Sequence, residues 1–70
     1  MVSYKFEEGG FFTVTLANGE VWKQTVGDTN LARWRNRPET YAVTIMPGQN
    51  LDSKRMKVGD DEVYEVQRIR

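Results

Sequence analysis

An Asn-Gly pair, Asn18-Gly19, separates two runs of β-branched and aromatic residues and constrains the fold more than any other feature of the chain. The runs, residues 12–16 and 21–26, alternate in part between apolar and polar side chains. Asn-Gly is the preferred two-residue loop of a type I′ turn, because both central residues must take a positive φ. The pattern therefore predicts a twisted antiparallel hairpin. A two-residue loop sets its expected cross-strand pairs, which are Ala17 with Glu20, Leu16 with Val21, Thr15 with Trp22 and Val14 with Lys23.

Turn-forming residues recur along the rest of the chain, at 9–10, 27–30, 47–50 and 59–61. Between them lie candidate strands at residues 2–6, 40–46, 54–58 and 62–69. The last of these does not keep a clean period of two, which a bulge or a short 3₁₀ turn near Gln67 would explain. Short strands at such spacing are typical of a small barrel or sandwich. We expect one domain over residues 1–70, all-β, an SH3-like barrel of five to six short antiparallel strands. At most one helical turn is expected, near residues 29–34.

Composition excludes most catalytic chemistry. The 70 residues contain neither histidine nor cysteine, which removes the commonest general base and the usual zinc ligands. No phosphate-binding glycine loop or nucleophile elbow is present. The acidic triplet Asp60-Asp61-Glu62 lacks the ligand spacing of a calcium loop and is expected to be a solvated hairpin tip. We therefore expect no enzyme, no cofactor and no metal.

Charge and hydropathy set the expected environment. The formal net charge is zero, so no overall field favours nucleic acid or anionic lipid. No apolar run approaches the ~20 residues of a membrane span, and no signal-peptide pattern precedes the first strand. A soluble chain without a membrane span is expected, and the compartment and the oligomeric state are left open.

The segment from Leu31 to Pro38 is the strongest candidate for a binding site, because three arginines alternate around an indole. Arg33, Arg35 and Arg37 can pair with carboxylates or phosphates, while Trp34 fills a partner's pocket or stacks on a base. The alternative is that Trp34 and Leu31 fold back as a lid on an open barrel end. The arginines would then solvate the loop and pair with Asp28, Glu39 or the acidic C-terminal half. The sequence does not decide between the two.

Two further aromatic residues are candidates for the same surface. Trp22 lies in mid-strand, where a core position is favoured and a groove-lining role is the alternative. Phe11 and Phe12 are adjacent and must point to opposite faces of a regular strand. Phe12 aligns with Val14 and Leu16 as a core residue, which leaves Phe11 as a surface aromatic.

The function favoured by these features is a non-enzymatic interaction module that binds a protein or peptide through the Arg/Trp-rich loop. The predicted partner-binding residues are Phe11, Trp22, Arg33, Trp34, Arg35 and Arg37. One alternative is nucleic-acid binding, by aromatic stacking and arginine–phosphate contacts. Another is a structural or homo-oligomerising domain that has no ligand.

The chain also resembles a family of short, largely uncharacterised proteobacterial envelope-associated proteins. The resemblance rests on the block Phe12-x-Val14-x-Leu16-x-Asn18-Gly19-x-Val21-Trp22-x-Gln24, on Val43-Thr44-Ile45 and Gly48, and on the terminal Val66-x-Arg68-Ile69-Arg70. It implies a compact β-barrel, a periplasmic or cell-envelope location and no catalytic residues. The segment of residues 27–40 is longer than the usual connection in that family.

Overall fold

Short runs of β-branched and aromatic residues form the strands, and glycine- and asparagine-containing turns separate them. The computed structural model describes residues 1–28, 30–48 and 53–70. Within these residues there are six strands: β1 (Ser3–Phe6), β2 (Phe12–Thr15), β3 (Val21–Gln24), β4 (Val43–Pro47), β5 (Lys54–Val58) and β6 (Glu62–Arg68). All pairings are antiparallel. The predicted all-β class and the number of short strands are confirmed.

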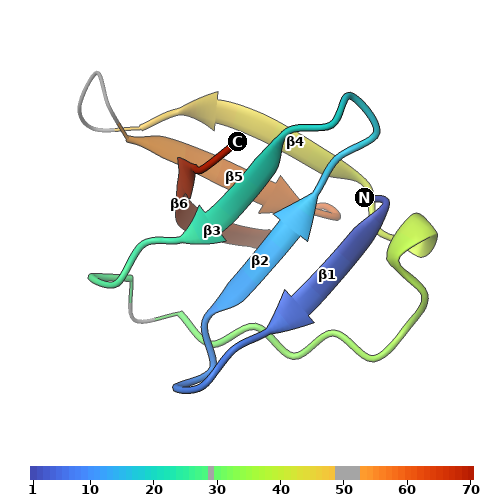
Figure 1. Ribbon diagram of the computed structural model, residues 1–70, viewed down its shortest axis with the longest axis horizontal. Coiled ribbons are helices and arrows are strands. Elements are labelled where there is room, and N and C mark those ends of the chain that lie inside the picture. The colour runs from blue at the N-terminus through green and yellow to red at the C-terminus, as the bar shows by residue number, and fades with distance from the viewer. Residues whose placement is uncertain (29, 49–52) are drawn as a thin grey trace.

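The strands form one sheet in the order β1-β2-β3-β6-β5-β4. Each half is a meander of three strands, and the pairing of β3 with β6 joins the halves. Figure 1 shows β1–β3 crossing in front of β4 and β5. The sheet is therefore folded on itself around a single core, with β1 and β4 as its two edges. Pro47, which has no N–H to donate, lies in the edge strand β4.

The predicted hairpin is present, but its register differs by one residue from the prediction. The observed pairs are Thr13 with Lys23, Val14 with Trp22 and Thr15 with Val21. The Leu16 N–H donates to the Glu20 carbonyl over 2.9 Å, so the loop has three residues, 17–19. Only Gly19 in this loop takes a positive φ, of 88°. A three-residue loop that ends in a left-handed glycine is a common alternative to the type I′ turn.

The register matters because successive side chains in a strand point to opposite faces. In the observed register Trp22 and Gln24 share the inner face with Phe12 and Val14, and all four are buried. A shift by one residue in the pairing changes which side chains of the hairpin are cross-strand neighbours. Trp22 therefore faces Val14 and not Thr15.

Two further expectations require correction. The bulge lies at the end of the chain and not at Gln67, since the Val21 carbonyl accepts hydrogen bonds from both Ile69 and Arg70. The helical turn is the 3₁₀ helix η1 (Pro38–Thr40), the one helix among the described residues. Proline is well suited to begin a helix, because its φ is already set and its missing N–H needs no partner. Thr29 lies outside the described residues, and residues 30–34 are extended or irregular.

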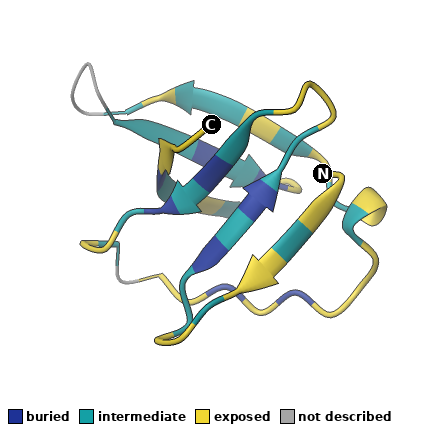
Figure 2. Cartoon of the chain, viewed as in Figure 1, coloured by how far each residue is buried: buried dark blue, intermediate teal, exposed yellow. Residues whose placement is uncertain are grey.

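The core lies between the two halves of the sheet, as the dark blue segments of β2, β3, β5 and β6 show in Figure 2. Its buried apolar side chains are Phe12, Val14, Trp22, Ala32, Trp34, Met56, Val58, Tyr64 and Val66. Ala32 and Trp34 come from the connection between β3 and β4, so this connection completes the core. In Figure 1 it runs along the lower side of the molecule toward η1.

Candidate interaction site

The connection between β3 and β4 contains the segment of residues 30–37, in which exposed and buried side chains alternate from Leu31 to Arg35 before a bend at Asn36. Ala32 and Trp34 are buried, whereas Leu31, Arg33 and Arg35 are exposed. An extended chain directs successive side chains to opposite sides, so this alternation follows from the backbone. The apolar side packs on the core and the other side presents arginines to solvent.

Trp34 is a core residue, and it is only 5% exposed. Its ring lies 4.7 Å from that of Phe12 and 5.4 Å from that of Tyr4, measured between centroids. Further ring contacts reach Phe6, Tyr41 and Tyr64 at 5.5–5.9 Å. Trp34 is therefore buried, as the lid interpretation predicts for this residue, and it is not an exposed anchor. Leu31 differs from the lid interpretation, because it is exposed.

Two tyrosine hydroxyls fix the outer half of the segment. The Tyr41 hydroxyl accepts hydrogen bonds from the backbone N–H groups of Arg35 and Asn36, each over 3.1 Å. The Tyr4 hydroxyl donates to the Asn36 carbonyl over 2.6 Å. These contacts connect the segment to β1 and to the entry of β4, and they satisfy backbone groups that no strand pairs. The partner of the Tyr4 hydroxyl is 32 residues away in the chain, so no local sequence pattern predicts this contact.

Asp28 fixes the start of the segment. Its Oδ1 accepts a hydrogen bond from the Asn30 N–H over 3.2 Å, which forms an Asx-type turn. Its Oδ2 accepts from the buried side chain of Gln24 and from the Glu65 N–H, at 3.0 and 3.1 Å. The Asp28 carboxylate thus links the start of this segment to both β3 and β6.

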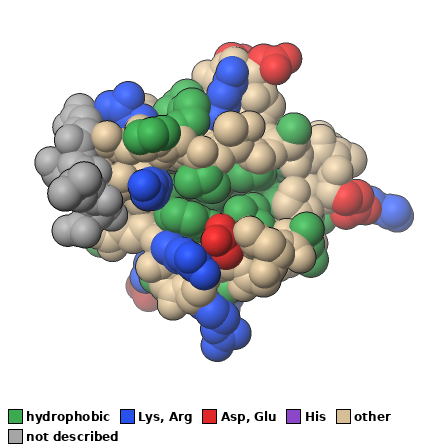
Figure 3. All heavy atoms as spheres, turned by 90° about the horizontal axis from the view of Figure 1, so that it is seen from above, with side chains coloured by type: hydrophobic (Ala, Val, Ile, Leu, Met, Phe, Trp, Pro, Cys, Tyr) green, Lys and Arg blue, Asp and Glu red, His purple; other side chains and the backbone are tan. Residues whose placement is uncertain are grey.

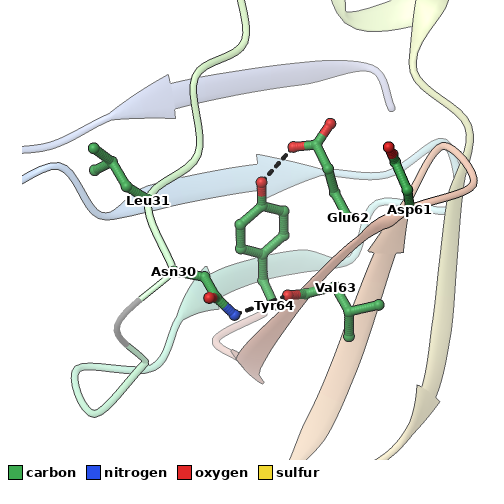
Figure 4. A pocket seen from close by; sticks show the side chains of 6 residues that line it. All are labelled: Asn30, Leu31, Asp61, Glu62, Val63 and Tyr64. Carbon is green, nitrogen blue, oxygen red and sulfur yellow. Dashed lines mark hydrogen bonds between the residues drawn. The ribbon is translucent and has the colours of Figure 1, made fainter.

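Glu62 fixes the segment from the side of β6. Its Oε1 accepts a hydrogen bond from Trp34 Nε1 over 3.3 Å and another from the Tyr64 hydroxyl. Figure 4 shows Tyr64 between the Asn30–Leu31 backbone and the turn that carries Asp61 and Glu62. Burial raises the pKa of the Tyr64 hydroxyl, and the hydrogen bond to Glu62 and its negative charge raise it further.

The hollow in Figure 4 has a volume of about 420 Å³ and has two acidic side chains on its rim, Asp61 and Glu62. Asp60 and Asp61 are exposed, as expected for a hairpin tip. Glu62 differs from the prediction, because it is half-buried and bonded to two aromatic side chains. Among residues 1–28, 30–48 and 53–70 no group of three or more Asp or Glu side chains is arranged to hold a metal ion.

The outer side of the segment carries Arg33, Arg35 and Arg37, which we name the arginine row. All three are exposed. In the described part of the chain the ion pairs join Lys23 to Glu7 and Arg68 to Glu20, and none involves the arginine row. A shallow pocket of about 330 Å³ lies beside two of the arginines, lined by Phe6, Ala32, Arg33, Trp34 and Arg35.

The other predicted site residues lie elsewhere. Trp22 is buried at 5% exposure, which confirms the core position. Phe11 is half-buried and not a freely exposed aromatic. Phe6, which the sequence analysis did not select, is 36% exposed and lies in the pocket beside the arginine row. The structure therefore brings Arg33 and Arg35 together with Phe6 in one pocket, and Trp22 does not line it.

Comparisons with known proteins identify no relative, since no protein family, no curated protein and no solved structure matches the chain. The resemblance to envelope-associated proteins therefore stays a prediction. Within the described residues there is no helix of the length and apolar character that a membrane crossing requires.

Proposed function

We propose that the protein is a non-enzymatic interaction module that binds an acidic, extended segment of another protein through the arginine row and Phe6. The observation that carries the proposal is a row of exposed arginines without ion partners among the described residues, on a segment held at three places. A preorganised surface loses little conformational freedom on binding. The free guanidinium groups are suited to pair with carboxylates in bidentate geometry.

The expected spacing of the partner follows from the extended backbone. Arg33 and Arg35, which are two residues apart before the bend at Asn36, project from one side at a spacing of about 7 Å. An extended partner that carries Asp or Glu at alternate positions has the same repeat. Phe6 adds an apolar contact next to Arg33 and Arg35. The pairing therefore favours an extended acidic peptide over a compact anion.

We also propose that the fold is an SH3-like barrel. Nucleic-acid binding, the alternative function, receives less support. An SH3-like barrel is supported by two meanders that curve around one core and by a long connection that carries the candidate surface. Nucleic-acid binding would use exposed aromatic rings for stacking. Trp22 and Trp34 are both buried, so that function receives less support.

The test is fluorescence anisotropy with a labelled peptide that carries glutamate at alternate positions. We expect saturable binding, and a loss of about tenfold in affinity in the Arg33→Gln/Arg35→Gln variant. The control variant, Arg55→Gln/Lys57→Gln, removes the same charge from β5, and its affinity should stay near that of the wild type.

Three results would contradict the proposal. Equal losses in both variants would mean that only the total charge matters. Tighter binding of single-stranded DNA, with a log–log salt slope near 0.7 per phosphate neutralised, would favour the nucleic-acid function. Self-association that the Arg33→Gln/Arg35→Gln variant removes would favour the homo-oligomerising domain.

A further inference from the structure

The end of the core away from Trp34 opens at a second hollow, of about 540 Å³, between β3 and the strands β4–β6. We name it the basic mouth, and its lining residues are Glu20, Trp22, Ile45, Lys54, Gln67 and Arg68. Figure 3, seen from above, shows hydrophobic side chains exposed in the middle of the molecule, with basic and acidic side chains beside them. The volume is within the range of small-molecule sites, about 300–1,000 Å³.

The register of β5 and β6 places charged residues on the inner face of the sheet, at the end that opens into the basic mouth. Met56 and Val58 are buried, so Lys54, two residues before Met56, is on the inner face of β5. Its cross-strand partner in β6 is the buried Val66. Arg68 follows Tyr64 and Val66 on the inner face of β6 and pairs with the buried Trp22. The inner face is thus apolar along its length and ends in two cations.

The three basic residues of β5 do not share one face of the strand. Arg55 and Lys57 are on the outer face, opposite Met56, whereas Lys54 is on the same face as Met56. Inward-pointing charges can also discourage unwanted sheet pairing. That explanation applies to edge strands, but β5 and β6 are interior strands of the sheet.

The charges of the mouth leave one cation unpaired. The Glu20 carboxylate accepts a hydrogen bond from Trp22 Nε1 over 3.2 Å and forms an ion pair with Arg68 over 3.3 Å. Arg68 also donates from Nε to the Arg70 carbonyl. Lys54, which is half-buried, forms no ion pair with any residue in 1–28, 30–48 and 53–70. The mouth therefore has one net positive charge, next to the apolar side chains of Trp22 and Ile45.

We propose that the basic mouth binds a small aliphatic monocarboxylate, with its carboxylate on Lys54 and its apolar chain against Trp22 and Ile45. Lys54, the one lining cation without an ion pair in the described part of the chain, fits one anionic group, and the apolar side chains of Trp22 and Ile45 fit a short alkyl chain. The basic mouth shares no lining residue with the pocket beside the arginine row, so the proposal does not depend on the proposed function.

The test is a titration of the ¹⁵N-labelled protein with sodium hexanoate, followed by two-dimensional NMR. We expect the indole N–H signal of Trp22 to shift in a saturable way while that of Trp34 stays in place. Hexylammonium, which has the same chain and the opposite charge, should produce a much smaller shift. Equal shifts with both compounds would overturn the proposal, and so would a shift of Trp34 alone.

Two variants of one strand test the role of Lys54. Lys54→Met should weaken hexanoate binding by about tenfold or more, since it removes a hydrogen bond to a charged group. Lys57→Met makes the same change on the outer face of β5 and should leave the affinity unchanged. Equal affinities in the two variants would refute the proposal. If Lys54→Met does not fold, Lys54→Arg should retain binding of hexanoate over hexylammonium, and failure to discriminate would count against the site.

Discussion

The two interpretations of the loop, as a binding site or as a lid on the core, make different predictions for Trp34. Its indole is 5% exposed and contacts five other rings, so its removal should leave a large cavity. We predict that Trp34→Ala lowers the free energy of unfolding by about 3–5 kcal/mol. Urea denaturation followed by circular dichroism measures the change. Trp34→Phe should cost less, and Arg35→Ala, on the outer side of the same segment, less than about 0.5 kcal/mol. A nearly neutral Trp34→Ala would restore the anchor interpretation.

Tyr64 should make the protein sensitive to alkaline pH. Its pKa is raised in the folded state by burial and by Glu62. The stability that it contributes is therefore complete below the unfolded-state pKa of about 10 and is lost as pH rises toward the folded-state pKa. The expected result is a fall in the urea midpoint above about pH 10 that is shallower in Tyr64→Phe. If the urea midpoints of the wild type and Tyr64→Phe fell in parallel as pH rises, Tyr64 would not be the cause of the loss of stability at alkaline pH.

At the scale of the element, the β2–β3 hairpin shows what a turn motif can and cannot specify. Gly19 has a φ of 88°, and a Cβ added there would meet no atom within 4 Å. We predict that Gly19→Ala costs about 1 kcal/mol, through backbone strain alone. Gly27→Ala is a matched control, since Gly27 also has open space around it but no positive φ. Chemical denaturation should separate the two, and equal costs would rule out the left-handed conformation as the cause.

The hairpin and the connection between β3 and β4 also show how much of an element can be predicted from the sequence. Asn18-Gly19 and the flanking β-type residues predict the turn and both strands correctly. They do not determine the register, because Asn-Gly is compatible with a two-residue loop and with a three-residue loop. In the loop, the alternation of Leu31, Ala32, Arg33 and Trp34 contains the signal for one buried and one exposed side. That signal could not be used without knowing that the segment is extended.

At the scale of the whole molecule, the pairing of β3 with β6 is what the sequence could not supply. Period two and turn residues identify each strand locally, but no local pattern says which strands far apart in the chain are neighbours. The β3–β6 pairing joins residues such as Gln24 and Val66, 42 positions apart by number. It also decides that Lys54, Arg68 and Trp22 meet at one end of the core. The basic mouth therefore follows from topology, whereas the arginine row could be predicted from sequence.

Because β6 joins the two halves of the sheet, we expect these halves to unfold cooperatively. Val66 is fully buried and pairs with Lys54 on β5 and with Gln24 on β3, so it contacts both halves of the sheet. Val66→Ala should lower the free energy of unfolding by about 2 kcal/mol or more. Val63→Ala in the same strand, at 38% exposure, controls for β-propensity and should cost under about 0.5 kcal/mol. Because the halves share one core, tryptophan fluorescence and circular dichroism should give the same midpoint in each variant. Separate midpoints in Val66→Ala would mean that the two meanders unfold independently.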